Sequence, residues 1–85
     1  MRTLNFHADP VHACLEVPIA ELVSLGIDDS ISCYSYAKGD TAYLEEDCDA
    51  GRYLNKLKES GTEFKFNEIY AENTPIRNYN SFTRR

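Results

Sequence analysis

The fold is decided by the stretch Ile31-Ser32-Cys33-Tyr34-Ser35-Tyr36-Ala37-Lys38-Gly39-Asp40-Thr41-Ala42-Tyr43-Leu44-Glu45-Glu46-Asp47. Two runs of strand-forming residues flank a short turn that contains glycine, which is typical of a β-hairpin. Side chains alternate between the two faces of a strand, so either possible two-residue turn gives the same two faces. One face is expected to carry Ile31, Cys33, Ala37, Ala42 and Leu44. The other face is expected to carry Tyr34, Tyr36, Tyr43 and Glu45.

Periodic patterns on both sides of this hairpin predict the other elements. Residues 13–17 and 62–71 alternate between apolar and polar side chains, which predicts two further strands. Pro18 and Gly26 bracket a short predicted helix, since proline favours the first helical position and glycine the position after the last. Residues 48–60 are predicted to form a longer helix, capped by Asp47 or Asp49 and ended by Gly61. Its apolar stripe consists of Ala50, Tyr53, Leu54 and Leu57.

The predicted order is strand, helix, strand, strand, helix, strand. In one sheet with right-handed crossovers, this order gives an α+β fold of the ferredoxin-like βαββαβ type. The expected architecture is a four-stranded antiparallel sheet with two helices on one face and the tyrosines on the other. The alternative is an α+β sheet in which residues 4–7 add an edge strand and only the second helix packs fully.

The chain has 85 residues, which is enough for one domain. Residues 1–72 are predicted to form this domain, and residues 73–85 a C-terminal tail that is either docked or a binding arm. No apolar run approaches the ~18–20 residues that cross a bilayer, and the N-terminus lacks the apolar core of a signal peptide. We therefore expect a cytoplasmic protein without membrane contact. The three cysteines are expected to be reduced.

Charge is unevenly distributed along the chain, whose formal net charge is −5. Residues 1–50 hold ten acidic and two basic residues, whereas residues 51–85 hold four acidic and seven basic ones. An acidic body repels phosphate backbones, so direct binding of nucleic acid is disfavoured. The aromatic sheet face is similar to that of RNA-recognition domains, but its neighbours here are acids rather than bases. The charge distribution favours a protein partner with a basic surface.

The tyrosine face and the acidic run beside it form the candidate interface. Tyrosine is enriched at protein interfaces, and carboxylates at the rim steer a basic partner. The predicted partner-binding residues are Tyr34, Tyr36, Tyr43, Glu45, Glu46, Asp47 and Asp49. Two other interpretations stay open: the same rings pack under the C-terminal tail or between two copies of a homodimer. The acidic run is also explained as a strand end followed by a helix cap in solvent.

No pattern in the sequence indicates a catalytic residue, a metal site or a cofactor. The spacing His7-x-Asp9-x-x-His12 offers ligands that zinc accepts, but the turn at Asp9-Pro10 leaves their convergence open. The acidic run lacks the register of an EF-hand loop, and no phosphate-binding glycine loop is present. The leading hypothesis is a non-enzymatic interaction module. The alternative is a small ligand-binding or enzymatic dimer whose pocket contains His7, His12 and the carboxylates near residue 47.

Three short strings carry a resemblance to known proteins: Leu15-Glu16-Val17-Pro18, Tyr34-Ser35-Tyr36 and Tyr43-Leu44-Glu45-Glu46-Asp47-Cys48-Asp49. Over residues ~9–80 the chain resembles small bacterial proteins of unassigned function, some of which are associated with phages or plasmids. The resemblance implies no catalytic residues. It implies an accessory role, such as that of an inhibitor or regulator of a host protein.

Overall fold

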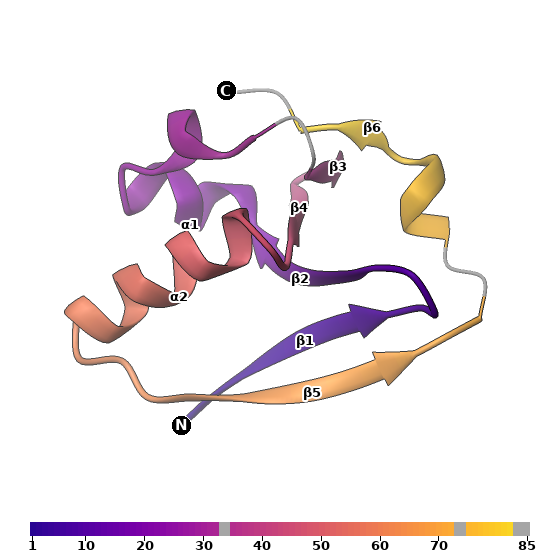
Figure 1. Cartoon of the computed structure of the whole chain (residues 1–85). Helices are drawn as coiled ribbons and strands as arrows, with labels where there is room; N and C mark the ends of the chain where they lie inside the picture. Colours follow the sequence, from indigo (N-terminus) through magenta and orange to yellow (C-terminus); the bar gives the residue numbers. More distant parts are fainter. Residues whose placement is uncertain (33–34, 73–74, 83–85) are drawn as a thin grey trace.

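The computed structural model describes residues 1–32, 35–72 and 75–82. In chain order the strands, helices and 3-10 turns are β1 (Arg2–Ala8), β2 (Ala13–Pro18), α1 (Ile19–Ser24), η1 (Asp28–Ser30), β3 (Tyr36–Lys38), β4 (Thr41–Glu45), α2 (Asp49–Glu59), β5 (Phe64–Tyr70), η2 (Pro75–Asn78) and β6 (Asn80–Ser81). The strands form one mixed sheet in the order β5-β1-β2-β4-β3-β6, with both helices packed against it (Figure 1). None of the helices in these residues is long and apolar enough to cross a membrane.

The α+β class is confirmed, but the four-stranded ferredoxin-like sheet is wrong. The difference comes mainly from β1, whose residues 2–8 lie between β5 and β2 rather than at an edge. β1 pairs in parallel with β5 and antiparallel with β2, so the sheet is mixed. Side chains of β1 point alternately to the two faces of the sheet. On the helix side Leu4 is buried and Phe6 is half-buried, and this burial stabilises the strand. β4 and β5, which α2 connects, are consequently separated by two strands.

The hairpin parity is confirmed for the residues that the structure describes. Tyr36 pairs with Tyr43 and Ala37 with Ala42, so the turn consists of Gly39 and Asp40. Gly39 has a φ of 61°, a conformation that glycine adopts without steric cost. The first hairpin strand is shorter than predicted, because it begins at Tyr36 and not at residue 31. Cys33 and Tyr34 lie outside the described residues.

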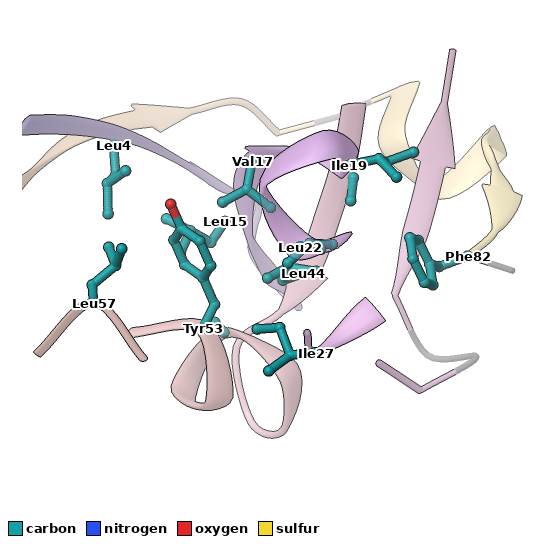
Figure 2. Packing of buried hydrophobic residues seen from close by; sticks show 12 residues of the cluster. Leu4, Leu15, Val17, Ile19, Leu22, Ile27, Leu44, Tyr53, Leu57 and Phe82 are labelled. Atoms are coloured by element: carbon teal, nitrogen blue, oxygen red, sulfur yellow. The ribbon is translucent and has the colours of Figure 1, made fainter. Parts of the chain in front are cut away.

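The hydrophobic core lies between the sheet and the two helices (Figure 2). Leu15, Val17, Ala42 and Leu44 come from the central strands and are at most 1% exposed. α2 spans almost the predicted residues and buries Ala50, Tyr53 and Leu57 of the predicted stripe. α1 also packs on the sheet, through the buried Ile19 and Leu22. The alternative interpretation thus has the additional strand over residues 4–7 right, but not its edge position or the packing of only the second helix. Val23, the other aliphatic residue near the end of α1, is exposed.

The described part of the C-terminal segment packs onto the sheet. Residues 80–81 form β6, which pairs with β3, and the side chains of Ile76 and Phe82 are each 4% exposed. The amide of Phe82 donates a hydrogen bond of 2.7 Å to the carbonyl of Ser35. Of the two forms expected for this tail, the structure shows the docked one over residues 75–82.

A polar cluster connects β1, α1 and α2 at the rim of this core. The Arg2 guanidinium forms a bidentate ion pair with the Glu21 carboxylate, which also accepts a hydrogen bond of 2.8 Å from the Tyr53 hydroxyl. Both donors favour the charged carboxylate, so the pKa of Glu21 lies below its ordinary value. Burial and the bond to Glu21 raise the pKa of Tyr53, which keeps the phenol protonated.

We expect the Glu21 cluster to make stability depend on pH in the acidic range. A carboxyl with a lowered folded-state pKa contributes stability above its unfolded value, near 4.5, and loses it as the pH falls through the lower folded value. Urea unfolding at pH 7 and pH 3 should therefore show a smaller loss of stability for Glu21→Gln than for the wild type. An identical loss in both proteins would show that Glu21 does not contribute.

Candidate functional site

The face of the sheet that points away from the helices is called the open face here. The register places His7 beside Cys14, Cys14 beside Glu45, Glu16 beside Tyr43, and Tyr43 beside Tyr36. Paired residues point to the same side of a sheet, so these side chains share one surface. Their neighbours along the strands, such as Leu15 and Leu44, point into the core. The strands therefore position the predicted Tyr36, Tyr43 and Glu45 together.

Tyr43 lies at the centre of an aromatic cluster on the open face. Its ring centroid is 5.2 Å from that of Tyr79 and 5.7 Å from that of His7. The Lys38 ammonium lies 4.9 Å from the Tyr79 ring centroid, within the range of a cation–π contact. Burial raises the pKa of Tyr43, with further contributions from Glu16 and Tyr79. The C-terminal segment thus packs on Tyr43, as one of the alternative interpretations expected.

His7 is paired with Glu16 rather than with the other predicted ligands. The His7 Nε2 atom lies 2.7 Å from Glu16 Oε1. The Asp9 carboxylate has backbone partners instead, since its Oδ1 accepts hydrogen bonds from the amides of Val11 and His12 at the β1–β2 turn. No group of three His, Cys, Asp or Glu side chains within the described ranges is arranged to hold a metal ion. The spacing of His7, Asp9 and His12 is thus accounted for by a strand pair and a turn.

A pocket of about 400 Å³ opens at the end of the open face that adjoins the β4–α2 turn. Its walls include the predicted Tyr36, Glu45 and Asp47, together with His12 and Cys48. Tyr36 and Glu45 are half-buried, whereas Asp47 and Cys48 are exposed. The pocket contains His12 and the carboxylates near residue 47 that the alternative interpretation of the sequence placed together, but not His7.

The two described thiols at this pocket are poor nucleophiles. Cys14 is buried, and burial with the nearby carboxylates of Glu45 and Asp9 raises its pKa to about 11. Desolvation and the same kind of acidic neighbours raise the pKa of Cys48. Because the thiolate is the reactive form, such thiols are mostly protonated at neutral pH. Neither described thiol is therefore activated for nucleophilic attack.

Asp49 does not belong to the exposed acidic surface, which corrects one predicted site residue. Its side chain is 0% exposed, and Oδ2 accepts hydrogen bonds from the Ser32 amide and from the hydroxyls of Ser32 and Ser35. It is the first residue of α2 rather than its cap, and Cys48 occupies the cap position without a side-chain bond. Ser32 and Ser35 therefore bind this carboxylate, and neither of these two described residues belongs to a strand.

The remaining predicted residues lie at the surface or outside the described ranges. Glu46 and Asp47 are exposed in the turn between β4 and α2. Glu45 Oε2 accepts a hydrogen bond of 3.0 Å from the Cys48 amide, so this carboxylate also fixes the turn. Tyr34 lies outside the residues that the structure describes. Tyr79 is a member of the open face that the sequence pattern did not assign to it.

Comparison with known proteins finds no matching family model, no matching curated protein and no matching solved structure. The resemblance to small phage- or plasmid-associated proteins therefore stays a prediction.

Proposed function

We propose that the protein is a non-enzymatic interaction module whose open face binds a protein partner with a basic surface. One observation carries the proposal: a pocket of about 400 Å³ has the Tyr36 ring and the carboxylates of Glu45 and Asp47 in its walls. Tyrosine next to a hollow is typical of interface anchors, because the ring contributes apolar contact and the hydroxyl hydrogen-bonds. An inhibitory or regulatory role toward a host protein is the form that the resemblance implies.

Each side chain has a distinct part in this proposal. Tyr36 supplies the apolar contact, and Asp47, exposed at the rim, pairs with a lysine or arginine of the partner. Charges at a rim mainly raise the association rate and make binding sensitive to salt. Tyr43 acts indirectly, because Tyr79 packs against it and holds the C-terminal segment beside the pocket.

The proposal predicts that binding is lost when Tyr36 is replaced by alanine and Asp47 by lysine. A tagged wild-type protein is used to capture and identify partners from a lysate of the source cell, with a salt series. The identified partner is then purified and its affinity measured for the double variant, with a loss of roughly a hundredfold expected. Glu59→Lys, an equal charge change at the exposed end of α2, serves as the control and should bind as the wild type does. A double variant with unchanged affinity would place the interface elsewhere.

A second candidate function is the binding of a small ligand in the same pocket. Its volume is within the ~300–1,000 Å³ range of ligand sites, and His12 and Cys48 add polar groups to the walls. His7, which the sequence suggested for such a site, is instead paired with Glu16. In the case of ligand binding, metabolite mixtures would shift the amide resonances of the pocket residues, and no protein would be captured.

A further inference from the structure

A second hollow lies on the helix side of the sheet, near the β1–β2 turn. α2 begins beside β4 and runs away from this turn, as Figure 1 shows, and leaves this part of the sheet uncovered. The resulting groove has a volume of about 470 Å³. Its lining includes the apolar residues Phe6, Ala8, Ala13 and Phe66. Apolar side chains form its floor, since Phe6, Ala8, Ala13 and Phe66 occupy the helix-facing positions of their strands.

The groove is bordered by β5, which is the last strand on its side of the sheet. β5 pairs with β1 over all seven of its residues, from Phe64 to Tyr70. No strand of the described chain pairs with its other side, so that edge presents backbone donors and acceptors. The β5 side chains Phe66, Ile69 and Tyr70 are 47%, 38% and 60% exposed. A long edge with exposed apolar side chains is a template for the addition of another strand.

Charge defines what kind of strand fits beside this edge. Three carboxylates lie at the groove, on Asp9, Glu46 and Glu68, and Glu68 belongs to β5 itself. On the helix side of β5 the order is Phe66, Glu68 and Tyr70, which is apolar, acidic, apolar. A complementary strand therefore carries a basic residue opposite Glu68 and apolar residues two positions before and after it.

A second copy of this chain fits the same edge poorly. In an antiparallel pair of β5 strands centred on Asn67, Glu68 of each copy stands opposite Phe66 of the other. A register shifted by one pair places Glu68 opposite Glu68. Either arrangement sets a carboxylate against a ring or against another carboxylate, and neither supplies a cation. Charge complementarity thus favours a foreign cationic strand over self-association.

We propose that β5 binds an extended segment of a protein partner with an apolar-x-basic-x-apolar pattern. The segment adds as a seventh strand, its basic residue pairs with Glu68, and one apolar side chain enters the groove against Phe66 and Phe6. Specificity then comes from the alternate side chains and affinity from main-chain hydrogen bonds. This site lies on the other side of the sheet from the open face and does not depend on the function proposed for that face.

The test uses the labelled peptide fluorescein-Thr-Val-Thr-Arg-Thr-Val-Thr-amide. Its sequence is symmetric, so the arginine meets Glu68 in either a parallel or an antiparallel arrangement. Binding to the full chain is measured by fluorescence anisotropy, and amide shifts should concentrate on β5. Two N-methylated forms are compared, one methylated at the threonines and one at the valines and arginine. In strand addition only alternate amides face β5, so one form should lose binding and the other should keep it.

Charge exchange provides the second part of the test. Glu68→Lys should lower the affinity for the arginine peptide by roughly tenfold. This variant should bind more tightly to the peptide in which glutamate replaces the arginine. Glu59→Lys is the matched control, and Tyr36→Ala reports separately on the open face; both should bind the arginine peptide unchanged. Equal binding of the two methylated forms, indifference to Glu68→Lys, or no binding of the peptide would overturn the proposal. A concentration-dependent dimer with β5 at its interface would replace it with self-association.

Discussion

Replacement of Asp49 by alanine is expected to lower the free energy of unfolding by about 3 kcal/mol. The side chain is fully buried, and three donors, the Ser32 amide and the hydroxyls of Ser32 and Ser35, converge on its Oδ2 atom. Removal of the carboxylate takes this acceptor away from all three donors, and the Ser35 hydroxyl among them is buried. The Ser35 hydroxyl also accepts a hydrogen bond from the Glu45 amide, so the loss of stability extends to the end of β4.

Asp47 provides the control for this prediction, because it lies two residues away and is exposed. Asp47→Ala should change the unfolding free energy by no more than about 0.5 kcal/mol. Urea denaturation of both variants at pH 7, followed by circular dichroism, gives the comparison. If Asp49→Ala were as stable as Asp47→Ala, the serines would not depend on the carboxylate. The two aspartates are thus expected to separate stability from partner binding.

Truncation of Tyr53 to alanine is expected to cost about 4 kcal/mol of stability. Among the residues that the structure describes, Tyr53 has the largest fully buried side chain, and its ring fills the space between α2 and the strands (Figure 2). Its hydroxyl adds the hydrogen bond to Glu21, which ties α2 to α1. Tyr53→Phe keeps the ring and removes only this bond, so a smaller loss of about 1 kcal/mol is expected.

Thermal and urea unfolding of the two Tyr53 variants measure separately how much the ring and the hydroxyl contribute to stability. Asn55→Ala is the control on the same helix, because Asn55 is exposed and its replacement should stay within about 0.5 kcal/mol. A Tyr53→Phe variant as unstable as Tyr53→Ala would show that the polar cluster, not the packed ring, holds α2 in place.

Local patterns predicted the parts of the fold that depend on near neighbours in the chain. The faces of the hairpin follow from its turn and from alternation, and α2 follows from its stripe and its terminal glycine. β1 was harder to place, because its position depends on pairing with β5, far away in the sequence. β5 itself is exposed on both faces, so no burial pattern specifies whether its neighbour is parallel or antiparallel.

The candidate site was predicted in part for a similar reason. Tyr36, Tyr43 and Glu45 share a face because strand parity requires it, whereas Asp49 was grouped with Asp47 by composition. The spacing of residues in the helix could have revealed that Asp49 is buried. Asp49 precedes Tyr53 by four residues and so lies on the same, buried side of α2. Its partners Ser32 and Ser35 come from a loop that no periodic pattern describes.

The parallel pairing of β1 with β5 also has a consequence for how the chain reaches its folded state. Asn5 and Asn67 lie side by side although 62 positions separate them, so a large loop must close before this pair of strands forms. Contacts of such high sequence separation slow folding. During synthesis, β1 leaves the ribosome before β5, so its Leu4 and Phe6 side chains lack some of their final neighbours until β5 is made. The β1–β2 pair and α2 are available earlier, whereas β1 can pair with β5 only after residue 70 has emerged, and β6 follows last.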